Sequence, residues 1–289
     1  MKSFVSLGLL AIAAASMAQE AARRDTLTGD VRFHEGFRSA FLENERTLRV
    51  YVPPQYLSEP NRRFPVLYMH DGQNLFSGLT SFIPNQEWRA DESAEMLIRA
   101  GIIEPIIIVG IDNAGMSRGD EYLPLIIQNK DTLYGGRAED YGRFLVDEVM
   151  PFIKDRYRVN TDPRKTGLCG SSFGGVITHY LGLTYPKVFG NLGIVSPSLW
   201  VGKHERMIDD LHTMANAIKR QRVWVDMGGD EADAKTRSTF ETYTETWTKM
   251  LSKGGGICNA VMDEFAPHNE VAWARRFPSM LQFWYGVKR

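Results

Sequence analysis

The chain has 289 residues, of which 43% are hydrophobic and 24% are charged, and its formal net charge is −1. This composition fits one large globular domain. The positive and negative charges are interspersed, which argues against a nucleic-acid-binding surface or an acidic interaction tail, so we expect no nucleic-acid partner.

Residues 1–18 have the pattern of a secretory signal peptide. Lys2 supplies the positive start, and the apolar run Phe4–Ala15 is too short to span a bilayer. Small residues lead up to a predicted cleavage site after Ala18. We therefore expect a secreted or periplasmic protein with no membrane association after cleavage. An uncleaved anchor or a buried N-terminal helix is the alternative interpretation.

Two segments of the mature chain are expected after cleavage. Residues 19–30 are polar and predict a flexible N-terminus. Residues 31–289 contain no repeat and no Pro/Gly/Ser-rich linker, which indicates a single domain. The pattern does not indicate an oligomeric state.

The order of the predicted elements indicates an α/β protein. Alternating residues predict two antiparallel strands, Val31–Phe41 and Arg46–Val52. After them come apolar runs typical of buried strands, over Phe64–Met69, Pro105–Ile111, Lys165–Cys169, Phe189–Val195, Arg222–Met227 and Ile257–Met262. Helices are expected between and after these strands, over Trp88–Ala100, Glu139–Tyr157, Val176–Thr184, Ile208–Lys219, Ser238–Ser252 and Val271–Tyr285.

This alternation predicts a mostly parallel central sheet with helices on both faces and antiparallel N-terminal strands. Catalytic groups are then expected in loops at the carboxyl ends of the strands. The stretch Asp112–Gly136 shows little periodicity and is predicted to be a long loop. Pro151, inside the predicted helix Glu139–Tyr157, is expected to disturb that helix.

A candidate nucleophile lies in the pentapeptide Gly170–Gly174, which has the form G-x-S-x-G. A serine on a tight strand-to-helix turn exposes its hydroxyl, and glycines on either side avoid collisions. The helix that follows directs free N–H groups toward the serine, where negative charge develops in acyl transfer. Ser172 is therefore the candidate nucleophile. Because the pentapeptide also occurs by chance, a simple helix-capping role is the alternative.

A serine nucleophile needs a base, normally a histidine that a carboxylate orients. His268 follows the last predicted strand and is the histidine whose position fits the order serine, acid, histidine. The acid should follow the strand Arg222–Met227, where we prefer Glu231 and rank Asp230 second, with Asp233 as a further carboxylate.

The remaining candidate residues concern the reacting oxygen and the substrate. The backbone N–H groups of Phe173 and Gln73 are expected to form the oxyanion hole. Trp88 and Trp200 lie near the predicted site loops and are candidates for substrate binding, with a core position as the alternative. His70-Asp71 lacks further ligands at zinc-site spacing, so no metal and no cofactor are expected.

Several motifs together resemble a known family. They are HDGQNLF at 70–76, VGIDN at 109–113, EYLP at 121–124, GSSFGG at 170–175, SPSLW at 196–200 and PHNEVAW at 267–273. The chain resembles the esterase D / enterochelin-esterase-like family of the α/β-hydrolase superfamily over residues 40–285. This resemblance implies the α/β-hydrolase fold, Ser172 as nucleophile, His268 as base and an acid in the turn Gly228–Glu231. The family turn usually reads G-T-x-E or G-T-x-D, and here Gly229 replaces the threonine.

Three functions are compatible with these residues. The first is a secreted serine esterase that acts on acyl esters of carbohydrate, such as acetyl or feruloyl esters. The second is a periplasmic esterase for a siderophore trilactone of the enterochelin type. The third is a non-catalytic binding module on a hydrolase scaffold, which the complete set of triad residues argues against. For either enzyme the expected partner is a small-molecule or polysaccharide ester.

Overall fold

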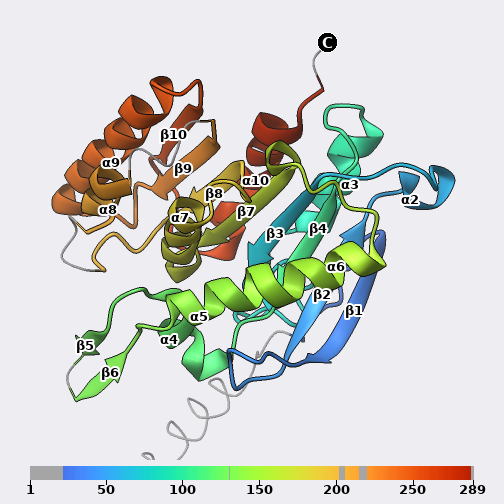
Figure 1. Cartoon of the computed structure of the whole chain (residues 1–289), viewed down its shortest axis with the longest axis horizontal. Coiled ribbons are helices and arrows are strands. Elements are labelled where there is room, and N and C mark those ends of the chain that lie inside the picture. The colour runs from blue at the N-terminus through green and yellow to red at the C-terminus, as the bar shows by residue number, and fades with distance from the viewer. Residues whose placement is uncertain (1–21, 130, 202–205, 215–219, 288–289) are drawn as a thin grey trace, which may run out of the picture.

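The computed structural model describes residues 22–129, 131–201, 206–214 and 220–287 (Figure 1). The predicted signal peptide, residues 1–18, lies outside the described residues. The centre of the molecule is an eight-stranded sheet in the order β1-β2-β4-β3-β7-β8-β9-β10. Its strands are β1 (Asp30–Phe37), β2 (Arg46–Val52), β3 (Val66–His70), β4 (Ile107–Ile111), β7 (Thr166–Ser171), β8 (Asn191–Val195), β9 (Arg222–Gly228) and β10 (Ile257–Asp263).

The pairing of the strands confirms the predicted architecture. β1 pairs antiparallel with β2, and β2 pairs antiparallel with β4. All other neighbours in this sheet are parallel. The carboxyl ends of β3, β7, β8, β9 and β10 therefore meet along one edge of the sheet, where ligand sites of such folds are found.

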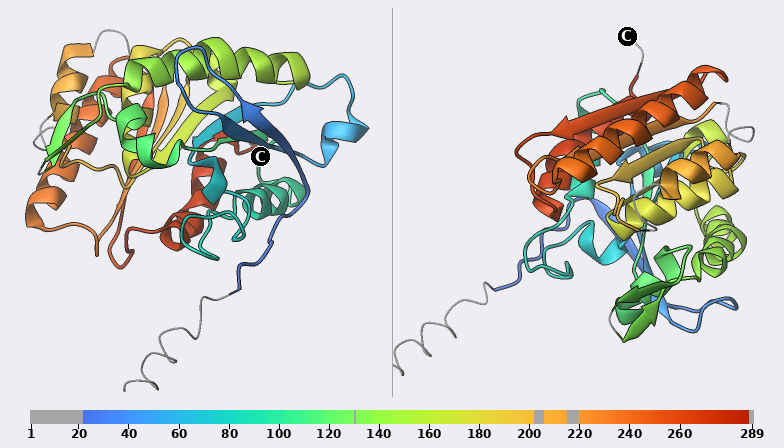
Figure 2. Two further views of the ribbon diagram at one scale, coloured as in Figure 1. Left: turned by 90° about the horizontal axis from the view of Figure 1, so that it is seen from below. Right: turned by 90° about the vertical axis from the view of Figure 1, so that its left-hand side faces the viewer.

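Helices cover both faces of the sheet (Figures 1 and 2). Leu67 and Met69 of β3 pack on the face covered by α3 (Ala90–Arg99) and α10 (Glu270–Tyr285). Alternate residues of a strand point to opposite faces, so Val66 and Tyr68 belong to the other core. That face is covered by α5 (Ala138–Arg143), α6 (Met150–Arg156), α7 (Phe173–Thr184), α8 (Arg206–Met214) and α9 (Ala234–Ser252). Burial on both faces explains the continuous apolar runs.

The predicted loop Asp112–Gly136 is wrong in part, because short elements lie within it. They are η2 (Gly115–Ser117), α4 (Arg118–Tyr122) and the hairpin of β5 (Ile127–Asn129) with β6 (Thr132–Tyr134). Elements this short show too few turns or alternations for a periodic pattern to emerge. Other short helical segments are α2 (Gln55–Ser58), η1 (Gly72–Asn74) and η4 (Pro163–Lys165).

Three predicted helices differ in detail from the structure. The helix expected over Glu139–Tyr157 contains a π-helical segment, Phe144–Val149, directly before α6, whose first turn holds Pro151. Proline cannot donate a backbone hydrogen bond, so the regular ladder is interrupted there. α9 begins earlier than expected because the Asp233 side chain caps it, accepting the Thr236 N–H at 2.7 Å. Residues 215–219 of the helix predicted over Ile208–Lys219 lie outside the described residues.

Residues 22–29, expected to be flexible, carry no helix or strand but contact the segment 77–91. The Arg23 guanidinium donates to two carbonyls of that segment, at 3.0 and 2.9 Å. The Thr26 hydroxyl binds Glu87, and the Thr28 N–H donates to Asp91 at 2.6 Å. The segment is thus held more closely than its sequence predicted. In the described parts of the chain no helix is long and apolar enough to cross a membrane.

Candidate active site

Ser172 lies at the sharp turn between β7 and α7. Its backbone adopts φ 60° and ψ −120°, a conformation that residues other than glycine rarely take, and its N–H donates to the Val195 carbonyl at 3.0 Å. A Cβ at Gly170 would come within 2.8 Å of the His70 ring and 2.9 Å of the Gly174 backbone, so this position requires glycine. The turn therefore has the strained geometry expected for a nucleophile elbow.

His268 and Glu231 are brought together from two neighbouring turns. Glu231 follows the end of β9, and His268 lies between the end of β10 and the start of α10. The Nδ1 atom of His268 contacts Oε2 of Glu231. Because a carboxylate only accepts hydrogen bonds, Nδ1 carries the hydrogen in the neutral ring and Nε2 is left as the basic atom. This is the tautomer that a general base next to a serine requires.

Glu231 is held by further donors and stays ionised. Its Oε1 accepts the Ser196 hydroxyl at 2.7 Å and the backbone N–H of Gly228. Burial alone raises the pKa of Glu231, but the hydrogen bond and charge of His268, with the Ser196 and Gly228 bonds, hold that pKa below its ordinary value. Only 8% of the Glu231 side chain is exposed, against 40% of His268.

The other two carboxylates of this turn lie elsewhere. Asp230 is exposed, and its backbone N–H donates to the Ala266 carbonyl at 3.3 Å. Asp233 caps α9. Of the three carboxylates that the sequence left open, Glu231 is therefore the one in contact with His268.

Ser172 and His268 line one cavity of about 630 Å³ at the carboxyl edge of the sheet. Among the described residues no hydrogen bond joins the two side chains. The Ser172 hydroxyl instead lies 3.3 Å from the Ser198 hydroxyl. Hydrogen bonds between nucleophile and base are often loose in free enzymes and tighten when substrate binds. The site thus contains the pair Glu231 and His268, and Ser172 lines the same cavity as His268.

Of the two predicted oxyanion donors, Gln73 lines this cavity, and Phe173 directly follows Ser172, which also lines it. Phe173 is the first residue of α7, and the first N–H groups of a helix have no partner within it. Gln73 belongs to η1 and lines the cavity. Its carbonyl accepts the Thr80 hydroxyl at 2.8 Å, and its Oε1 accepts the Asn113 N–H at 3.1 Å. These bonds fix the loop on which the Gln73 N–H is presented.

His70 and Asp71 shape this loop through separate partners. Asp71 adopts φ 57° and is buried, and it accepts two bonds from Arg118, at 2.6 and 2.8 Å, and one from Asn113 at 2.7 Å. His70 is paired with the Tyr141 hydroxyl at 2.8 Å, and burial lowers its pKa to about 3. In the described part of the chain, His, Cys, Asp and Glu form no group of three or more that could hold a metal ion.

The structure separates the two tryptophans predicted to bind substrate. Trp88 is 2% exposed and packs against Trp273 and Phe277, with ring centres 5.8 and 5.6 Å apart, so its prediction as a substrate-binding residue is wrong. It belongs to the core beneath α10. Trp200 is 50% exposed and lies 5.8 Å from the Phe173 ring, beside the nucleophile turn.

The sequence patterns did not predict the buried polar network that lies beneath Glu231. The Ser196 hydroxyl that donates to Glu231 accepts bonds from Trp273 Nε1 at 3.0 Å and Arg276 Nη2 at 3.2 Å. Arg276 also donates to Asp226 at 3.1 Å, and Asp226 is fully buried. The available signal was Asp226 itself, a charge inside an apolar strand, because a buried charge needs a partner.

Comparisons with known proteins identify the family of this chain. A family model described as "Putative esterase" matches residues 39–284. The protein YbbA of Bacillus subtilis is 25% identical over 264 residues, which cover 88% of this chain and 98% of that one. The endo-1,4-beta-xylanase/feruloyl esterase of Xylanibacter ruminicola is 25% identical over 267 residues, covering 90% of this chain and 32% of that protein.

A solved structure is similar over most of the chain. The siderophore hydrolase EstA of Aspergillus nidulans superposes with a TM-score of 0.67 at 15% identity, covering 89% of this chain and 94% of that one. This likeness concerns the fold. Since the family model covers nearly the whole of the described domain, the chain belongs to this esterase family of the α/β-hydrolases and is a carboxylic ester hydrolase.

Proposed function

We propose that the protein is an exported serine esterase that cleaves aromatic acyl esters of carbohydrates, such as feruloyl esters, with Ser172, His268 and Glu231 as its triad. The observation that carries the choice of acyl group is the wall of the active-site cavity. Phe82 is 80% exposed, Met116 is fully exposed, and both line the cavity together with Ile83. Exposed apolar residues grouped around a cavity are typical of a binding site.

The size of the cavity supports an aromatic group over an acetyl group. A volume of about 630 Å³ far exceeds what a two-carbon acyl group fills. The apolar side chains of Phe82, Ile83 and Met116 would hold an aromatic ring in the cavity that Ser172 also lines. The endo-1,4-beta-xylanase/feruloyl esterase of Xylanibacter ruminicola is similar over 90% of this chain, which corresponds to 32% of that protein, and this similarity supports the same assignment.

In the proposed reaction His268 accepts the Ser172 proton at Nε2 as the serine oxygen bonds to the ester carbonyl carbon. Negative charge on the carbonyl oxygen is stabilised by the N–H groups of Phe173 and Gln73. His268 then gives its proton to the leaving alcohol, and the acyl group remains on Ser172. A water molecule, deprotonated by His268, releases the acid and restores the serine. Glu231 keeps its charge throughout and stabilises the imidazolium.

A siderophore ester is the second candidate, because EstA is a siderophore hydrolase with this fold. The charged residues that line the cavity make a siderophore ester a poorer candidate than a feruloyl ester. The Arg118 guanidinium in the wall is already paired with Asp71 through two hydrogen bonds. The wall also contains Glu270, whose pKa is raised by burial. Such a wall offers no surplus of positive charge to an anionic iron complex.

Export is proposed from the sequence alone. The pattern of Lys2, the apolar run Phe4–Ala15 and the small residues that precede Ala18 supports a cleaved signal peptide. N-terminal sequencing of the protein recovered from the periplasm or medium of an expressing bacterium should begin at Gln19. Recovery of the intact N-terminus in the membrane fraction would contradict the proposal.

The substrate proposal is tested with purified mature protein and a panel of esters. We expect methyl ferulate and feruloylated oligosaccharides to be cleaved faster than acetylated xylan or a siderophore trilactone. Ser172→Ala should lower kcat by up to ~10⁶-fold, whereas Ser238→Ala, at an exposed serine of α9, should leave it unchanged. Preference for the trilactone would replace the proposed substrate, and an active Ser172→Ala enzyme would refute the nucleophile.

A further inference from the structure

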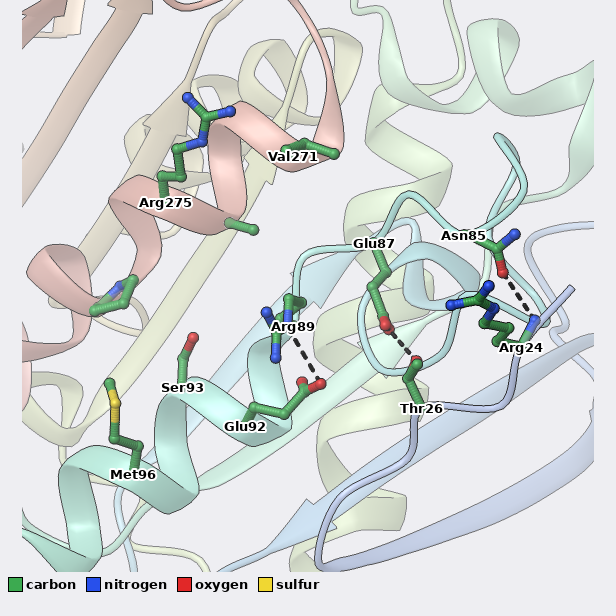
Figure 3. A pocket seen from close by; sticks show the side chains of 12 residues that line it. Arg24, Thr26, Asn85, Glu87, Arg89, Glu92, Ser93, Met96, Val271 and Arg275 are labelled. Carbon is green, nitrogen blue, oxygen red and sulfur yellow. Dashed lines mark hydrogen bonds and ion pairs between the residues drawn. The ribbon is translucent and has the colours of Figure 1, made fainter. Parts of the chain in front are cut away.

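A second cavity, of about 600 Å³, lies between α3, α10, residues 24–26 and residues 85–89 (Figure 3). We call it the α3–α10 cavity. Its volume is in the range of small-molecule sites, and none of its lining residues lines the active-site cavity. The proposed hydrolysis uses none of these residues.

The two cavities flank the same two segments of chain. Ile83 lines the active-site cavity and Asn85 the α3–α10 cavity, and two residues of chain span at most about 7 Å. At the start of α10, Glu270 faces the active-site cavity and the next residue, Val271, lines the other. The segment 83–85 and the start of α10 therefore border both cavities.

The polar groups of the α3–α10 cavity include unpaired donors. In the part of the chain that the structure describes, the guanidinium groups of Arg24 and Arg275 have neither a hydrogen-bond nor an ion-pair partner. Arg275 is carried by α10 at one side of the cavity, and Arg24 lies at the other side, beside Asn85 (Figure 3). These groups can donate to oxygen atoms of a ligand in the cavity.

Acceptors line the same cavity. Only 6% of Glu87 is exposed. In Figure 3 its carboxyl lies between Arg24 and Arg89. Glu92 of α3 also lines the cavity and forms an ion pair with Arg89 at 3.3 Å. Carboxylates accept hydrogen bonds and repel an anionic ligand, whereas uncharged hydroxyl groups both donate and accept. The mixture of guanidinium and carboxyl groups therefore fits a polyhydroxyl ligand better than phosphate or a carboxylate.

Apolar side chains complete the lining. Met96 of α3 is 56% exposed, and Val271 of α10 is 38% exposed. Ala274 and Pro278, also of α10, line the cavity with them. A sugar ring presents C–H groups on its faces and hydroxyl groups around its edge. Apolar contacts beside planar polar side chains suit both parts of such a ring.

We propose that the α3–α10 cavity binds the carbohydrate chain of the ester substrate while the acyl group occupies the active-site cavity. This inference rests on the proposed function. It assigns recognition of the alcohol part to Arg24, Arg275 and the apolar residues of α3 and α10.

The first test compares two substrates that share the feruloyl group. Arg275→Ala should raise KM for a feruloylated arabinoxylan oligosaccharide about tenfold, the effect of losing one hydrogen bond to a charged group. Ala274→Trp, which narrows the cavity, should raise the same KM at least as much. The same variants should leave kcat/KM for methyl ferulate within about twofold. Arg164→Ala, at an exposed arginine beyond the opposite end of β7, is the matched control and should change neither value. Equal changes for both substrates, or none, would overturn the proposal.

The second test does not depend on turnover. Xylohexaose is titrated calorimetrically into the Ser172→Ala protein and into the same protein carrying Ala274→Trp. Binding that the tryptophan abolishes supports the site, and binding that it leaves unchanged, or no binding to either protein, overturns it. Failure of the proposed function would be seen separately, as a wild-type enzyme that does not cleave methyl ferulate.

Discussion

Ser196 gives the sharpest test of how the acid of the active site is positioned. Its hydroxyl donates to Glu231 at 2.7 Å and accepts from Trp273 Nε1 at 3.0 Å and Arg276 at 3.2 Å. Its backbone also has a positive φ of 39°, a further sign that this position is held by its surroundings. Ser196→Ala removes all three bonds and leaves the volume of the site almost unchanged.

The expected loss of stability depends on which hydrogen bonds the three partners of Ser196 keep in the variant. Arg276 keeps Asp226, and Glu231 keeps His268 and Gly228, but the buried Trp273 N–H is left without an acceptor. An unsatisfied buried donor costs about 1–3 kcal/mol, and a hydrogen bond to a charged group contributes about 1.5–3 kcal/mol. We expect the free energy of unfolding to fall by about 3 kcal/mol. With a less firmly held carboxylate, kcat should fall about tenfold, which corresponds to about 1.4 kcal/mol.

Urea denaturation measures the first quantity and steady-state kinetics with methyl ferulate the second. Thr166→Val is the matched control, because it removes a buried hydroxyl that donates to the Asp162 carbonyl at 3.1 Å, at the start of β7 and away from the site. It should lower stability without lowering kcat. A Ser196→Ala enzyme with wild-type kcat would refute the positioning role, and one with wild-type stability would refute the network as drawn.

Three further predictions concern the acid, the stability and the tryptophans. Glu231→Gln should lower kcat by about 10⁴-fold with a smaller change in KM, since the amide cannot stabilise the imidazolium; a loss of less than about tenfold would contradict the triad. Burial lowers the pKa values of His70 and His179 to about 3, from 6.5 when unfolded, so stability is full above pH 6.5 and is lost as the pH falls toward 3. Between pH 7 and pH 5 each histidine should cost about 2 kcal/mol in urea denaturation, and a flat profile would refute the neutral buried rings. Trp88→Ala should lower the melting temperature because it opens a core cavity, whereas Trp200→Ala should leave stability nearly unchanged and alter KM; the reverse pattern would contradict their placement.

Local patterns identified most of the fold and several site residues. The strands β3, β4, β7, β8 and β9 are buried on both faces of the sheet. Because both faces need apolar side chains, each of these strands reads as a continuous apolar run in the sequence. The G-x-S-x-G turn around Ser172 and the post-strand positions of Glu231 and His268 could be predicted because strand ends of a parallel sheet meet at one edge.

The short elements within residues 112–136 could not be predicted in this way. A strand of three residues or a helix of five presents too little periodicity, and its stability depends on contacts made from elsewhere. Arg118, at the start of α4, owes its place at the active-site cavity to its pairing with Asp71, which lies 47 positions earlier in the chain.

The sequence by itself determined the chain order of the eight strands of the central sheet and of the longer helices, the elbow at Ser172 and the turns that hold His268 and the candidate acids. Only the tertiary structure decided that Glu231 rather than Asp230 contacts His268 and that Trp88 is buried while Trp200 is exposed. The tertiary structure also joined Ser196, Trp273 and Arg276 beneath the acid. The physical reason is that hydropathy and turn patterns report on neighbours along the chain. The direction of a side chain in a turn, by contrast, is set by partners that folding brings from distant positions.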